Sequence, residues 1–207
     1  MHDPHDPRDT LTPALTSAEL QQLVQVAEQA VAMAVLHGST LHPDVGDFPR
    51  SLGEPGAVFV TLRRHGRLRG CIGTLVATDP LVVAVADRAR AAALADPRFD
   101  PVRADELDEI EVSVSVLSPP RPLPVERFAD LVDALHPGQD GLVVVAGGHR
   151  ATFLPSVWEE LPDPLAFLDA LWRKAGLAPR AWPPDIAVSR YHAQHAPAEG
   201  HERLGGG

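Results

Sequence analysis

The only cysteine of the chain lies in its most unusual stretch, residues 68–75, which reads Leu-Arg-Gly-Cys-Ile-Gly-Thr-Leu. Cys71 stands between two glycines, and four arginines crowd the same short region: Arg63, Arg64, Arg67 and Arg69. Guanidinium groups favour the thiolate of a neighbouring cysteine, and the thiolate is the nucleophilic form. The pattern therefore indicates a reactive or ligand-facing thiol on the floor of a cleft that attracts anions.

A β-strand places alternate side chains on opposite faces. On such a strand one face, the core side, carries Leu68, Gly70, Ile72 and Thr74, and the other carries Arg67, Arg69, Cys71, Gly73 and Leu75. The two glycines indicate a bulge, or a place where another backbone or a ligand comes close. A second interpretation stays open, because a free cysteine is often only a small buried packing residue.

The stretch resembles the signature of the AMMECR-one domain family, whose prokaryotic members belong to AmmeMemoRadiSam systems. Further similar segments extend the resemblance to about residues 16–193; they include Asp96-Pro97-Arg98-Phe99, Gly138-Gln139-Asp140-Gly141-Leu142, Thr152-Phe153-Leu154-Pro155 and Ser189-Arg190-Tyr191. The resemblance implies an α+β fold of two unequal lobes with the cysteine motif at a groove between them. It also implies an operon shared with a Memo-like protein, which resembles extradiol dioxygenases, and with a radical S-adenosylmethionine protein.

Two functions follow from these residues. In the first, Cys71 is a nucleophile or redox thiol activated by Arg69 or Arg67, and Asp140, Asp96 or His149 acts as acid or base. In the second, the same cleft is a non-catalytic binding module for a partner peptide or an anionic small molecule. Beside the catalytic candidates Cys71, Arg69 and Asp140, the expected substrate-binding residues are Arg67, Gly70, Ile72, Gly73, Thr74, Asp96, Arg98 and His149.

Composition narrows the class of protein. The chain of 207 residues has 44% hydrophobic and 22% charged residues, which is ordinary for a soluble globular protein. Its net charge of -10 argues against general binding to nucleic acid or anionic membranes. A single cysteine allows no internal disulfide and fits the reducing cytoplasm, where we expect the protein. We expect no cofactor and no metal, because the sequence has no phosphate-binding glycine loop and no converging ligand set.

Hairpins and helices mix without a βαβ rhythm, which predicts α+β architecture with antiparallel sheets and flanking helices. We expect disordered tails over residues 1–15 and 196–207 around one domain, residues 16–195, with two lobes. A capping box at Thr16–Glu19 begins a helix that ends near Gly38. The other expected helices follow Asp79-Pro80, span 125–135 and 155–161, and follow Asp163-Pro164. The expected strands are 58–62, 67–75, 110–116, 142–146, 150–154 and 186–191.

Overall fold

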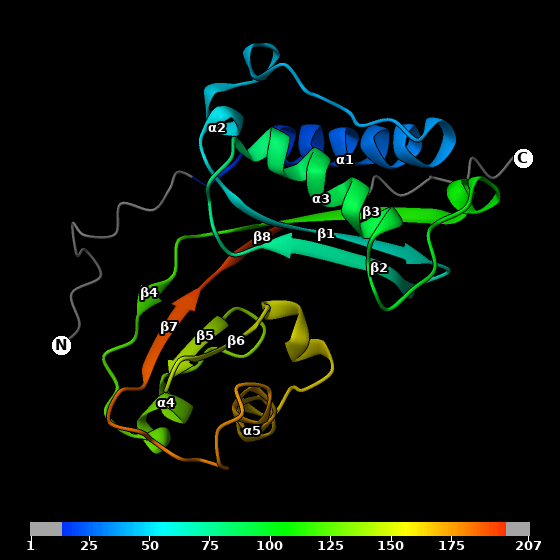
Figure 1. Ribbon diagram of the computed structural model, residues 1–207. Coiled ribbons are helices and arrows are strands. Elements are labelled where there is room, and N and C mark those ends of the chain that lie inside the picture. Colours follow the sequence, from blue (N-terminus) through cyan, green and yellow to red (C-terminus); the bar gives the residue numbers. More distant parts are fainter. Residues whose placement is uncertain (1–13, 198–207) are drawn as a thin grey trace, which may run out of the picture. The chain divides into compact units, whose positions relative to one another are not determined.

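The computed structural model describes residues 14–197 and divides them into two compact units. The first unit holds the described residues up to Leu117 together with those from Gln194 onward, and the second unit is Ser118–Ala193. Each unit has its own four-stranded sheet, and the strands pair antiparallel (Figure 1). The α+β class and the antiparallel hairpins are therefore confirmed.

The first unit packs two long helices on one face of its sheet, whose strand order is β2-β1-β3-β8. Its elements are α1 (Ser17–His37), the 3-10 helix η1 (Val45–Asp47), α2 (Arg50–Gly53), β1 (Ala57–Arg64), β2 (Arg67–Thr74), α3 (Leu81–Leu94), the 3-10 helix η2 (Ala104–Glu109), β3 (Ile110–Leu117) and β8 (Ala193–Pro197). The predicted capping box is present, since Thr16 and Glu19 bond each other's backbone, and Gly38 ends α1.

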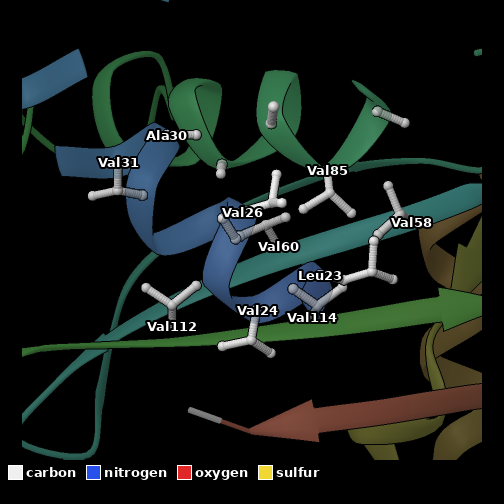
Figure 2. Packing of buried hydrophobic residues seen from close by; sticks show 14 of the residues in the cluster. Leu23, Val24, Val26, Ala30, Val31, Val58, Val60, Val85, Val112 and Val114 are labelled. Carbon is white, nitrogen blue, oxygen red and sulfur yellow. The ribbon is translucent and has the colours of Figure 1, made fainter. Parts of the chain in front are cut away.

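The core of the first unit lies between these helices and the sheet. Figure 2 shows side chains of α1 and α3 packing against alternate residues of β1 and β3. On β1 the inward residues are Val58, Val60 and Leu62, all fully buried, while Phe59 and Thr61 between them are only partly buried. This period of two is what an antiparallel strand with one apolar face requires.

The second unit contains β4 (Arg121–Pro122), α4 (Phe128–Ala134), β5 (Gly141–Ala146), β6 (His149–Phe153), the 3-10 helix η3 (Pro155–Glu159), α5 (Pro164–Lys174) and β7 (Ala187–Tyr191). Its sheet has the order β4-β7-β5-β6. Aromatic rings dominate its core: Trp158 stacks on Phe167 with ring centroids 3.9 Å apart, and Phe128 meets Trp172 edge-on at 5.1 Å. Trp172 is thus a core residue, which is the usual use of such a large apolar surface.

The structure corrects several expected boundaries. The helix after Asp79-Pro80 begins at Leu81, because Pro80 stays extended, bridges to Pro55, and leaves the Leu81 N–H bonded to the Glu54 carbonyl. The helix expected over 125–135 spans only Phe128–Ala134, and the one expected over 155–161 is a 3-10 helix that spans only Pro155–Glu159.

The inner ends of both expected tails belong to the fold of the first unit. Leu15 is buried in the core of the first unit, and its N–H and carbonyl both bond the Gln194 side chain. At the other end β8 continues to Pro197, inside the range expected to be a tail. The remaining tail residues, 1–13 and 198–207, lie outside the described residues.

Candidate functional site

The cysteine motif forms β2, an edge strand of the first sheet, as the hairpin reading predicted. Cys71 lies opposite Thr61 of β1, and Leu62 lies opposite Gly70. The next residue of β1, Arg63, pairs with Leu68, so Arg69 is an extra residue without a partner on β1. This irregularity is a β-bulge, which interrupts the simple alternation of side chains along the strand.

Gly70 and Ile72 face the helices and fix the position of the strand. A Cβ added at Gly70 would overlap the carbonyl oxygen of Ala92 on α3, so only glycine allows this close approach of strand and helix. Ile72 packs against the core of the first unit. These two residues were expected to contact substrate; the structure instead places them on the core side.

Gly73 faces the other way, and its lack of a side chain makes room for a ring. A Cβ at this position would overlap the ring of Phe59, which lies opposite it on β1. Gly73 therefore allows Phe59 to lie flat over the motif strand, which is one of the uses of glycine within a sheet.

Asp96 and Arg98, in the loop after α3, hold the outer edge of β2 at Cys71. The Cys71 N–H donates to Asp96 Oδ2 at 2.8 Å, and Arg98 Nη2 donates to the Cys71 carbonyl at 3.1 Å. Arg98 also donates from Nε and Nη2 to the two Asp96 oxygens, at 2.9 and 2.7 Å. The carboxylate–guanidinium pair thus takes the place of a neighbouring strand, which blunts an edge that would otherwise recruit another chain.

Electrostatics follow from these contacts. The Asp96 carboxylate is almost fully buried, and the hydrogen bonds from Arg98, more than those from the Cys71 and Arg98 backbones, lower its pKa far below the usual range. The hydrogen bonds to Asp96 in turn raise the pKa of Arg98, and the nearby Cys71 side chain also favours the charged guanidinium. Arg98 is therefore the guanidinium associated with the cysteine.

Arg69 lies elsewhere. Its Nε and Nη2 donate to Glu106 Oε1 and Oε2 at 3.0 and 2.9 Å, and its Nη1 donates to the Asp100 carbonyl at 2.8 Å. Arg64, which continues the inward series of β1, binds the same Glu106 at 3.0 Å. The expected pairing of Arg69 with the thiol is corrected, because the bulge turns its side chain to this carboxylate.

Glu106 is the buried carboxylate that holds the two arginines together. Only 4% of it is exposed, and it also accepts the Arg103 N–H at 2.9 Å. Hydrogen bonds from Arg69, and then from the Arg103 backbone, lower the pKa of Glu106 to about 2. Sequence reasoning did not identify this residue, because an isolated glutamate in a polar loop carries no local signal of its partners.

The Cys71 side chain lies on the face of the sheet opposite the helices, and it is partly exposed. Thr61 Oγ1 donates to Cys71 Sγ at 3.3 Å. On the other side of β1, Thr61 pairs with Ser113 of β3, and two residues away Phe59 pairs with Ser115. The Ser115 hydroxyl is 2.9 Å from His195 Nδ1. We call this set the polar face, which comprises Phe59, Thr61, Cys71, Ser113, Ser115 and His195. Strands are about 4.8 Å apart, so Thr61 is the polar side chain that directly contacts the thiol.

The remaining predicted site residues have other surroundings. Arg67 is exposed at the hairpin end, and the Thr74 hydroxyl bonds both backbone groups of Val76 in the turn after β2. Asp140 and His149 belong to the second unit, where Asp140 is fully buried and His149 begins β6. Among the described residues, no group of three or more His, Cys, Asp or Glu side chains is arranged to hold a metal ion.

Comparison with known proteins gives the relationship directly. The AMMECR1 family model matches residues 24–196, which is most of the chain. The chain belongs to the AMMECR1 family. Similar proteins occur in Methanothermobacter thermautotrophicus, 42% identical over 87% of this chain and 94% of the relative, and in Thermococcus gammatolerans, 42% identical over 83% and 86%.

A solved structure supports the same fold. The crystal structure of an uncharacterised protein from Pyrococcus horikoshii superposes with a TM-score of 0.81 at 34% identity, covering 87% of this chain and 92% of that one. Within residues 14–197 of the AMMECR1 chain, the helices are all too short or too polar to cross a lipid bilayer.

Proposed function

We propose that this AMMECR1 chain is a thiol-dependent enzyme whose reacting group is Cys71. The observation that carries the proposal is the position of Cys71, a partly exposed residue on the polar face. Its backbone N–H and carbonyl are held by Asp96 and Arg98, and its Sγ accepts the Thr61 hydroxyl at 3.3 Å. A hydroxyl donor stabilises negative charge on sulfur, and a fixed nucleophile loses less entropy in the transition state.

The chemistry that suits this site is covalent catalysis with one thiol. Cys71 Sγ attacks an electrophilic carbon of the substrate, a leaving group departs with the electron pair of the broken bond, and water or an acceptor then releases the product and restores the thiol. The chain has a single cysteine, so no second thiol of the same chain can resolve a disulfide. Thr61 would stabilise the sulfur anion, and Asp96 is a positioning residue that acts through Arg98 and the Cys71 backbone.

We place this reaction in the pathway that the family resemblance suggests, together with a Memo-like protein and a radical S-adenosylmethionine protein. The substrate would then be an intermediate shared with these partners. A host strain that lacks its own copy of the gene provides the test in the cell. Wild-type protein should restore the pathway and Cys71→Ala should not, whereas full restoration by Cys71→Ala would refute a thiol-dependent reaction.

A second function, a non-catalytic binding module, is favoured by one specific observation. Two charged side chains expected to assist the thiol, Arg69 and Asp96, are each bound in an ion pair: Arg69 to Glu106, and Asp96 to Arg98. What is left on the polar face is a thiol, hydroxyls and one imidazole, which suit recognition of a peptide or a small polar molecule. This function predicts that Cys71→Ser, which keeps a small polar group, retains pathway activity.

The direct experiment is alkylation of the native protein by iodoacetamide at pH 7, with N-acetylcysteine as the reference thiol. We expect Cys71 to react faster than the reference, and Thr61→Val to slow it several-fold because the hydroxyl donor is lost while side-chain volume is kept. Thr61→Ser is the matched control, since it keeps the hydroxyl and should retain the fast rate. Reaction only after denaturation would overturn the enzyme proposal and leave Cys71 as a packing residue.

A further inference from the structure

The second unit contains a charged cluster that the cysteine chemistry does not use. It joins the loop after α4 to the end of β7, and its members are His136, Asp140, Arg190 and His192. Asp140 is fully buried, whereas the side chains of His136 and His192 are 61% and 53% exposed. One buried carboxylate therefore supports two surface imidazoles and a guanidinium.

The two oxygens of Asp140 have different partners. Oδ2 accepts the His136 N–H at 2.8 Å and also lies 3.3 Å from His136 Nδ1 and 3.5 Å from Arg190 Nη1. Oδ1 is buried without a hydrogen-bond partner, and His192 Nδ1 is 3.7 Å away. A buried carboxylate oxygen without a donor costs free energy, so a site that keeps one has a use for it.

The surroundings of His192 fix its tautomer. Its Nδ1 faces two acceptors, the Gln139 carbonyl at 3.4 Å and Asp140 Oδ1 at 3.7 Å, so Nδ1 must carry a proton. In the neutral ring the lone pair is then on Nε2, on the solvent side of an exposed side chain. A carboxylate behind Nδ1–H stabilises the imidazolium that forms when Nε2 takes a second proton.

Positive charge gathers at the same place although the whole chain carries -10. Arg190 lies directly opposite Arg121 of β4, which brings a second guanidinium to this end of the sheet. Within the cluster, Asp140 Oδ2 contacts Arg190 through Nη1. Arg190 can only donate, so its Nη1 contact at 3.0 Å makes His136 Nδ1 the acceptor and places the His136 proton on Nε2; the 3.3 Å approach of Nδ1 to Asp140 Oδ2 is then no hydrogen bond.

We propose that these residues form a binding site for a phosphate-class oxyanion, and that the anion binds together with a proton taken up by His192. Arg190 and the Nε2–H groups of His136 and His192 are the donors, because an oxyanion accepts charge-assisted hydrogen bonds from several directions at once. Asp140 is the positioning residue, since it orients His192 and compensates its charge. The proposal is independent of the thiol chemistry of Cys71.

Sulfate is the probe, because it carries no titratable proton near pH 8, where a free imidazole is mostly neutral. Calorimetric titration of the full chain at pH 8, in two buffers of different ionisation enthalpy, measures both affinity and the protons taken up. We expect saturable binding with uptake approaching one proton per sulfate. Absence of binding, or binding without proton uptake, would overturn the proposal.

Variants assign the roles. His192→Gln should abolish the uptake, and Arg190→Gln should weaken binding about tenfold or more, the usual effect of losing a charge-assisted hydrogen bond. His42→Gln, an exposed histidine of the first unit, should change neither quantity. Uptake that survives His192→Gln would refute the assignment.

The orienting role of Asp140 is tested by a measurement that would not change if Asp140 only supported the fold. Nitrogen-15 spectra at pH 8 should show the His192 proton on Nδ1, and in Asp140→Asn the sulfate-linked uptake should fall while sulfate still binds. Tryptophan fluorescence checks the fold, since Trp158 Nε1 bonds the Asp140 carbonyl. An Nε2–H tautomer in the unaltered protein would contradict the proposal. Inorganic phosphate and glycerol phosphate, titrated in the same way, tell whether the free anion or an ester is preferred.

Discussion

Replacing Asp96 by asparagine tests whether the Asp96–Arg98 pair is what fixes Cys71. The asparagine amide keeps the size of the carboxylate, but Oδ2 accepts the Cys71 N–H and Arg98 Nη2 while Oδ1 accepts the Arg98 N–H and Nε, so the NH2 group faces donors in either orientation. A buried N–H left unsatisfied costs about 1–3 kcal/mol. Arg98 is half exposed, so the lost ion pair adds at most about 1 kcal/mol. We expect Asp96→Asn to lower the free energy of unfolding of the first unit by about 2–3 kcal/mol.

The chain offers a separate probe for each unit. The two longest helices, α1 and α3, belong to the first unit, whereas all three tryptophans, Trp158, Trp172 and Trp182, belong to the second. The far-ultraviolet circular dichroism of the helices in urea therefore mainly follows the unfolding of the first unit, and tryptophan fluorescence follows that of the second. The free energy at zero urea comes from linear extrapolation of the circular dichroism data.

Arg98→Gln is the comparison variant, because it removes the guanidinium and leaves the Asp96 bond to the Cys71 N–H in place. It leaves the buried Asp96 carboxylate without its main partner, so it should also cost about 1–3 kcal/mol. The pH dependence of the stability follows from the same contacts. The pKa of Asp96 is lowered in the folded protein, so ionised Asp96 stabilises the first unit fully above about pH 4, and this stabilisation is lost as pH falls toward the folded pKa. The reasoning is refuted if Asp96→Asn costs less than about 0.5 kcal/mol, the range of an ordinary surface substitution, or if the difference between wild type and Asp96→Asn does not shrink in acid.

Three further predictions concern Gly70, Glu106 and Tyr191. Gly70→Ala should destabilise the first unit by about 3 kcal/mol because the added Cβ would overlap the Ala92 carbonyl, whereas Leu68→Ala, at an exposed position of the same strand, should cost less than about 1 kcal/mol. Equal effects of the two variants in urea unfolding would contradict the packing argument. The pKa of Glu106 is lowered to about 2, so its ionised form contributes about 3 kcal/mol to the free energy of unfolding above pH 4.5, and this contribution is lost as pH falls toward 2. A stability difference between wild type and Glu106→Gln that stays constant from pH 6 to pH 2.5 would argue against the paired carboxylate. Burial raises the pKa of Tyr191, the only tyrosine, to about 12, so the tyrosinate absorbance of the folded protein should appear near pH 12. Tyrosinate absorbance near pH 10 while the fold persists would mean an accessible hydroxyl and would contradict this prediction.

Local patterns predicted the elements that local forces determine. The capping box at Thr16–Glu19 and the glycine at Gly38 gave the ends of α1, and the alternation over residues 110–116 gave β3. The alternation along the motif strand placed the Cys71 side chain on the other face of the sheet from Gly70 and Ile72, which agrees with the observed faces. The family was also evident from the sequence, because several short motifs occur together in one chain.

The contacts that bring the loops after α3 against the motif strand are long-range and could not be predicted from a single sequence. Glu106 meets Arg69 across 37 positions, and Asp96 meets the Cys71 N–H across 25. The β-bulge at Arg69 changes the direction of one side chain without any signal besides the neighbouring Gly70. β8 was missed because Ala193–Pro197 has no apolar alternation and forms a strand only through its place beside β3.

These contacts also separate the motif residues by role. Gly70 and Ile72 fit the strand to the helices, Gly73 admits Phe59, and Arg69 binds Glu106, so each of these has a structural reason for its type. The Cys71 side chain has none of this kind. A cysteine used for packing would lie on the face of Gly70 and Ile72, yet Cys71 lies on the polar face against Thr61. Serine would satisfy Thr61 there equally well, so a requirement for sulfur must come from reactivity. Comparison of Cys71→Ser with Cys71→Ala in the pathway therefore decides between the two functions: equal loss means that the thiol reacts, and retention by serine means that the face only binds.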